Sequence, residues 1–150
     1  MSVQIRKNAE LFYKALEDVW VAEQIWKGSP NNAAWHCTQA VEKVIKGFLR
    51  CHNRDYDYGH ELKELLDAVD GLIELSPEIT KNILYLDRFV VALRYKNLSS
   101  DPTVSEAQTA VLRTKEIIQV FRKNPNVSTY LQEAEEVHAK VLASNNNLNT

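Results

Sequence analysis

The stretch from Asn31 to Arg50 constrains the fold more than any other part of the chain. Placed at about 100° per residue, its apolar side chains fall on one side of a helix. They are Ala33, Cys37, Ala40, Val41, Val44, Ile45 and Phe48. The other side carries what we call the polar stripe: Gln39, Lys43, Lys46 and Arg50. This pattern predicts a helix with one side in the core and the other facing solvent.

Helical spacing also runs through the residues before this stretch. Apolar and aromatic side chains at steps of three and four predict a long amphipathic helix over about 3–26, whose large aromatic residues cover much of the core. The turn Gly28-Ser29-Pro30 ends this helix, and a serine or asparagine here is expected to cap the next one. Such a short connection favours two antiparallel neighbours.

Two more helices are predicted in the middle of the chain. After Arg50, a polar loop leads to a short third helix within 61–71, where leucines repeat at helical spacing. The fourth helix begins at Ser76-Pro77-Glu78, because serine caps a helix, proline fits the first turn and glutamate stabilises the positive end of the dipole. It is expected to end between Arg94 and Asn97, since the residues that follow have the composition of a loop.

The last third of the chain predicts two further helices. The segment from Thr103 to Glu106 is typical of a capping box and begins a fifth helix, which Asn124-Pro125-Asn126 ends. A weaker sixth helix over about 127–143 is expected to lie across the bundle or to reach a partner chain, and the tail 143–150 is expected to fray. No alternating strand pattern competes anywhere. We therefore predict an all-α protein with one domain over 1–150, an up-and-down bundle of five to six helices with its core in about 3–123.

Composition narrows the environment and the classes of partner. Eighteen basic and twenty acidic residues give no global charge footprint for nucleic acid, so any such binding requires a local patch. Cys37 and Cys51 would lie about 21 Å apart along one helix and cannot form a disulfide within the chain, which favours reduced thiols in the cytoplasm. No apolar run is long enough to cross a membrane, and the first residues lack the apolar segment of a signal peptide.

Common catalytic motifs are missing from the sequence. It has no glycine-rich phosphate loop, no paired Cys-x-x-Cys, no His-Glu-x-x-His and no nucleophile elbow. The histidines at 36, 52, 60 and 138 do not have the spacing of a metal site, so neither a metal nor a cofactor is expected. His60 follows a glycine at the start of a helix, where it either fixes the loop by a hydrogen bond or moves a proton.

Two groups of cations are candidates for binding an anion. Lys43, Lys46 and Arg50 lie on one helical face beside Gln39 and His36, although such a stripe is usually only a solvated surface. Arg94 ends an apolar helix just before Tyr95, Lys96 and a polar loop. A cation there binds a ligand or complements the negative end of the helix dipole, and the sequence favours neither over the other.

Three segments resemble the HEPN family, the higher eukaryotes and prokaryotes nucleotide-binding domain. Residues 34–49 resemble its second-helix signature through Gln39-Ala40 and the following Glu42-Lys43 and Lys46. Gly59-His60-Glu61-Leu62 resembles the His-Asp-Leu element, with glutamate in place of aspartate, and Leu93-Arg94-Tyr95 resembles the Ala-Arg-Tyr element. Together these segments and the fifth helix cover most of residues 1–123.

The resemblance implies a compact helical bundle, often a homodimer, that binds a nucleotide or RNA. Many members are paired with a minimal nucleotidyltransferase as toxin and antitoxin. Ribonuclease members carry an arginine, a polar residue and then a histidine about four to six residues on, twice across a dimer, and cleave RNA without metal. In this chain no histidine follows Arg94 until His138, so His60 is the nearest family-matched candidate to move a proton.

Three functional hypotheses follow from these observations. The first is a module that binds a nucleotide, RNA or a partner protein through Arg94, Tyr95, Lys96, Lys43, Lys46 and His60. The second is a metal-independent ribonuclease toxin with a divergent site made from Arg94 and His60 across a dimer. The third is an interaction protein that pairs through its aromatic first helix or its last helix.

Overall fold

A computed structural model describes residues 4–54, 61–94 and 101–148, with side chains for 4–54, 61–90 and 101–147. Within these residues the chain is all-α, with six α-helices, one 3-10 turn and no strand, as predicted. The elements are η1 (Lys7–Ala9), α1 (Glu10–Ile25), α2 (Pro30–Cys51), α3 (Leu62–Val69), α4 (Pro77–Arg94), α5 (Val104–Arg122) and α6 (Ser128–Leu148).

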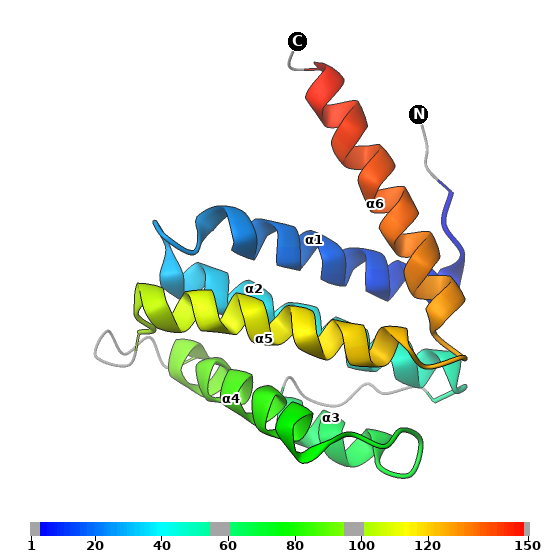
Figure 1. Cartoon of the computed structure of the whole chain (residues 1–150), viewed down its shortest axis with the longest axis horizontal. Coiled ribbons are helices and arrows are strands. Elements are labelled where there is room, and N and C mark those ends of the chain that lie inside the picture. Colours follow the sequence, from blue (N-terminus) through cyan, green and yellow to red (C-terminus); the bar gives the residue numbers. More distant parts are fainter. Residues whose placement is uncertain (1–3, 55–60, 95–100, 149–150) are drawn as a thin grey trace.

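The second helix is the centre of the bundle. It contacts α1, α3, α4 and α5, and Figure 1 shows α1, α2 and α5 running side by side with α4 below them. All seven apolar residues predicted for its core side are at most 1% exposed, which confirms the assignment. Core contacts therefore fix the rotation of α2, and this rotation decides where its polar stripe lies.

A glycine on α2 sets the distance between α1 and α2. A Cβ atom at Gly47 would lie 2.8 Å from Cε1 of Phe12, closer than real Cβ contacts come. The Phe12 ring is fully buried in the core and has little room to move away. Only glycine therefore allows α1 and α2 to approach this closely.

Two of the predicted helix caps are confirmed, and one is wrong. Ile79 N–H donates to the Ser76 hydroxyl at the start of α4 (3.2 Å), and Thr103 and Glu106 form a reciprocal capping box on α5. At the start of α2, by contrast, Ser29 makes no capping bond to the backbone. Its hydroxyl instead accepts a hydrogen bond from the Asn32 side-chain amide (2.7 Å), and Pro30 occupies the first helical position.

The first helix is shorter and less covered by the core than the sequence suggested. The chain enters through η1 and becomes α-helical only at Glu10, rather than near residue 3. Trp20 is one of the large aromatic residues of 3–26 that were expected to cover the core, yet it is 42% exposed, because it lies next to the buried face of α1 and not on it.

The last helix both crosses the bundle and extends beyond it. Its first half packs on α1, where Leu131 and Ala134 are fully buried, and Figure 1 shows the second half projecting away from the other helices. The prediction of a frayed tail over 143–150 is wrong up to Leu148, where α6 ends, and residues 149–150 lie outside the described residues. Extending a helix that packing has already nucleated costs little, and this accounts for its length. Within the described residues, no helix combines the length and apolarity needed to cross a membrane.

Candidate functional site

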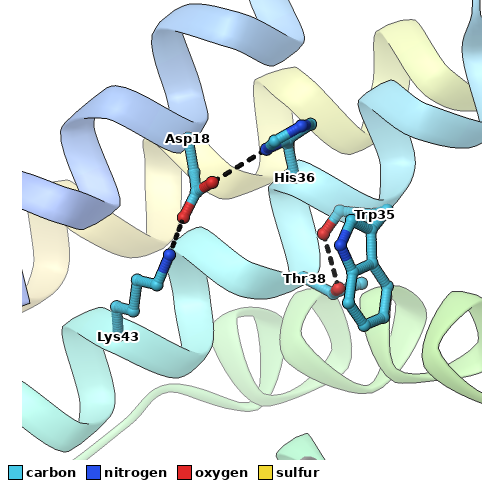
Figure 2. Close-up of polar contacts among 5 residues, drawn as sticks. All are labelled: Asp18, Trp35, His36, Thr38 and Lys43. Atoms are coloured by element: carbon cyan, nitrogen blue, oxygen red, sulfur yellow. Dashed lines mark hydrogen bonds and ion pairs between the residues drawn. The ribbon is translucent and has the colours of Figure 1, made fainter.

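A buried carboxylate on α1 organises the middle of the polar stripe. Asp18 is 8% exposed and lies between α1 and α2. Its Oδ1 is 2.8 Å from His36 Nδ1, and its Oδ2 accepts a hydrogen bond from Lys43 Nζ at 2.5 Å, as Figure 2 shows. We call these three residues the Asp18 cluster.

The spacing of α2 explains why one carboxylate reaches both partners. His36 and Lys43 are seven residues apart, which is about two helical turns, so they lie on the same side of α2 and face Asp18. Burying an unpaired carboxylate would be costly, whereas two polar partners offset that cost. The cluster therefore fixes the Lys43 ammonium and the His36 ring, whose side chains are 27% and 31% exposed.

Lys46 is held in a similar way one turn further along. Its Nζ donates to Glu42 Oε1 on the same helix (3.3 Å), and Glu42 is 4% exposed. Both predicted lysines thus have a carboxylate partner and are fixed in position. Because each ammonium is paired, Lys43 and Lys46 add little net positive charge to this part of the surface.

An exposed indole lies near the beginning of α2. Trp35 is 39% exposed, and its backbone carbonyl accepts a hydrogen bond from the buried Thr38 hydroxyl (2.7 Å; Figure 2). The Thr38 bond satisfies a polar group that would otherwise be buried without a partner. It leaves the Trp35 ring available as a flat apolar surface.

The remaining predicted site residues fall largely outside the described part of the chain. Arg94 is the last residue of α4, and Figure 1 shows that α4 ends on the side of the bundle where α2 and α5 begin. The Arg94 side chain, Tyr95, Lys96 and His60 lie outside the described residues. The suggested pairing of Arg94 with His60 therefore stays a prediction. Lys43 and Lys46, by contrast, lie on α2, about three and a half and four and a half turns after its start.

Sequence reasoning missed the role of Asp18. A charged residue beside Val19, within the apolar stripe of the first helix, is the signal that could have drawn attention to it. Its partners could not be read from the same pattern, because periodicity gives the face of a helix but not its neighbour.

One comparison with known proteins identifies the family. The model of the HEPN domain matches residues 8–124, which extend from η1 to just past the end of α5. The chain belongs to the HEPN family. The helical architecture of this HEPN domain agrees with the match, and α6 lies beyond it. No curated protein and no solved structure matches the chain.

Membership supports, at a coarse level, a module that binds nucleotides or resembles a ribonuclease. A finer function can be argued from three features along α2, which are the Asp18 cluster, the Glu42–Lys46 pair and Trp35.

Proposed function

We propose that this HEPN domain is a cytoplasmic module that binds a nucleotide or an RNA strand along the exposed side of α2. The observation that carries the proposal is the pair of fixed lysines on that side. Asp18 holds Lys43 and Glu42 holds Lys46, so both ammonium groups have settled positions while their side chains stay partly exposed.

Fixed donors favour binding because little side-chain entropy is lost when the ligand arrives. An ammonium group has three N–H donors, and a carboxylate that accepts one leaves others for phosphate oxygens. His36 has a different role, because its Nδ1 donates to Asp18 and Nε2 of the neutral ring is then an acceptor, suited to a ribose hydroxyl. Phosphate recognition by Lys43 and Lys46 is therefore governed by hydrogen-bond geometry rather than by net charge.

Trp35 supplies the contact that a base would use. Exposed aromatic rings stack on nucleobases, with a contribution of about 1–3 kcal/mol per base in single-strand binding. Trp35 and Lys46 are eleven residues apart, about three turns, and so lie on nearly the same side of α2. A strand with a base at Trp35 would direct its backbone along α2 toward the lysines.

The same proposal includes four further residues, Arg94, Tyr95, Lys96 and His60. Arg94, Tyr95 and His60 stand in segments that resemble family motifs, and Lys96 follows directly. Arg94 would add a phosphate contact where α4 ends. By analogy with its family, we also propose a homodimer and a minimal nucleotidyltransferase as the protein partner, in a toxin and antitoxin pair.

Calorimetric titration with ATP and with a short single-stranded RNA tests the proposal. We expect one of the two to bind with a dissociation constant below about 1 mM, and Lys43→Gln with Lys46→Gln to weaken binding several-fold. Lys115→Gln is the matched control, because this lysine pairs with Glu23 between α5 and α1. If neither ligand binds the wild type, the proposal is wrong.

The same RNA decides whether the module also cleaves. Incubation in the presence of a chelator, with wild type beside Arg94→Ala and His60→Ala, tests for metal-independent cleavage. RNA that stays intact while it binds supports the non-catalytic module. If the wild type cleaves RNA in the presence of the chelator and each substitution abolishes this cleavage, the ribonuclease hypothesis is supported and the non-catalytic module is wrong.

A further inference from the structure

A group of cations that the Asp18 cluster does not include gathers where α2 ends. Lys7 and Asn8 of η1, Arg50 of α2, and Asn53 and Arg54 of the following turn line a hollow of about 300 Å³. We call it the basic hollow. Lys7 and Arg54 are exposed and Arg50 is half-buried.

The charges of the basic hollow are not compensated by the described residues. Lys7, Arg50 and Arg54 make no ion pair within that part of the chain, and the lining residues that the structure describes include no carboxylate. With the same residues, the Arg50 side chain makes one long hydrogen bond, to the Lys7 carbonyl (3.5 Å). Neighbouring Arg6 points elsewhere, since it pairs with Glu133 and lies over the Tyr130 ring. Three cations around one concave surface, with no carboxylate partner among the described residues, attract an anion.

The carbonyl end of α2 does not cancel this attraction. Helix ends expose carbonyl oxygens that repel anions, but here Leu49 O accepts from the N–H groups of His52 and Arg54, and Arg50 O accepts from Asn53 N–H. The arrangement is a Schellman cap, with Asn53 in the left-handed conformation at φ 57°. It also turns the chain so that Arg54 lines the same hollow as Arg50.

We propose that the basic hollow is a separate binding site for a phosphate group of an RNA strand. Guanidinium groups match phosphate oxygens in a bidentate geometry, and the side-chain amides of Asn8 and Asn53 add donors. The class of ligand in this inference rests on the proposed function. The inference adds that the ligand is an RNA strand rather than a mononucleotide.

The reason for preferring a strand is the length of the surface. Lys43 and Arg50 are seven residues apart on the same side of α2, about 10 Å along the helix axis, and Trp35 lies about 22 Å before Arg50. A mononucleotide at the lysines would leave the basic hollow empty. A strand of several nucleotides can reach Trp35, the lysines and the hollow together.

Salt-dependent binding of a short single-stranded RNA tests the site. Each phosphate contact that is lost makes the slope of log K against log salt shallower by about 0.7 for a single strand. We expect Arg50→Gln with Arg54→Gln to weaken binding about tenfold and to make the slope shallower by about 0.7, and Lys7→Gln to act in the same direction. Lys81→Gln removes one exposed cation from α4 and serves as the matched control.

The outcomes separate this inference from the proposed function. If the double variant binds RNA with the wild-type affinity and the wild-type salt slope, the basic hollow is not a phosphate site. The proposed function then stands. If the wild type binds ATP but no RNA, the proposed function stands and the inference of an RNA strand is overturned. If it binds neither ligand, the proposed function falls, and calorimetry with pyrophosphate then decides the hollow alone. If the wild type binds pyrophosphate and the double variant does not, the site is supported. If the wild type binds no pyrophosphate, the site is overturned. A circular-dichroism melt of the double variant confirms that it is folded.

Discussion

The two regions of the polar side of α2 use their cations differently. In the middle of the helix, Lys43 and Lys46 are held by Asp18 and Glu42, so their positions are fixed and their charges are offset. At its end, Arg50 shares the basic hollow with Lys7 and Arg54 without any carboxylate among the described residues. The difference indicates that the middle of α2 contributes geometry and stability, whereas its end contributes net positive charge.

The largest effect we expect comes from the middle region. Asp18→Ala would leave Lys43 and His36 without their shared partner at the interface between α1 and α2. Removing one member of a buried pair typically costs 3–5 kcal/mol, and the partial exposure of both partners reduces this to about 2–3 kcal/mol. Urea denaturation of Asp18→Ala beside Arg54→Ala measures the contrast, because Arg54→Ala is expected to change stability by less than about 0.5 kcal/mol. Equal losses in the two variants would remove the distinction between the regions.

A second prediction compares the two thiols of α2. Burial raises the pKa of the Cys37 thiol to about 11, and burial also raises the pKa of Cys51, where nearby Arg50 acts in the opposite direction. Since the thiolate is the nucleophile, we expect Cys51 to be alkylated at least about tenfold faster than the buried Cys37 at pH 8. Below its pKa, the rate for Cys51 should rise about tenfold per pH unit.

Mass spectrometry of iodoacetamide-treated protein gives both rates from one sample. Arg50→Gln should slow Cys51, because it removes the charge that favours the thiolate. Comparable alkylation rates for Cys37 and Cys51 would show that α2 opens as a whole. The contrast between the two regions of α2 would then be wrong, because it requires a stably packed helix.

A third prediction concerns the close contact that lies between the two regions. Gly47→Ala gains about 1 kcal/mol of helix propensity, but the new methyl group would overlap the buried Phe12 ring, at a cost of about 1–3 kcal/mol. We expect a net loss of about 1 kcal/mol in the free energy of unfolding. The control is Gly28→Ala, since nothing lies within 4 Å of a Cβ there. A stabilised Gly47→Ala variant would mean that α1 and α2 can separate more easily than their packing suggests.

The smallest effect is expected from Asn53→Gly, at the cap that places Arg54, and Asn53→Val is its contrast. Asn53→Gly keeps the left-handed conformation and should change stability by only a few tenths of a kcal/mol, whereas Asn53→Val should cost about 1–2 kcal/mol. Thermal melts of the two variants give the comparison. Equal melting temperatures would indicate that the Schellman cap does not hold the turn at the end of α2.

The sequence predicted the core of α2 well, because periodicity alone identifies the side that is buried. It also gave the starts of α4 and α5, where Ser76 and Thr103 cap through local bonds. It failed where the outcome depends on packing between elements. Trp20 belonged to the apolar pattern of its segment yet is exposed, and the Ser29 hydroxyl is engaged by the Asn32 side chain rather than by the backbone.

The site was predictable only in part for the same reason. Lys43, Lys46 and Arg50 were found as a stripe, since they share one helical face. Asp18 and Lys7 are distant in sequence from their neighbours on α2, and only the antiparallel packing of α1 on α2 brings them there. Arg94 and His60 were singled out by their places at a helix end and a helix start, and the family resemblance suggested their joint role, which stays a prediction.

Amide chemical-shift mapping with single-stranded RNA tests the central claim most directly. The account predicts that the amides of Lys7, Asn8, Asn53 and Arg54 shift together with those around Lys43 and Lys46, and that Arg50→Gln with Arg54→Gln removes the first group of shifts only. Shifts confined to other surfaces of the bundle, with the whole exposed side of α2 silent at saturating RNA, would contradict it.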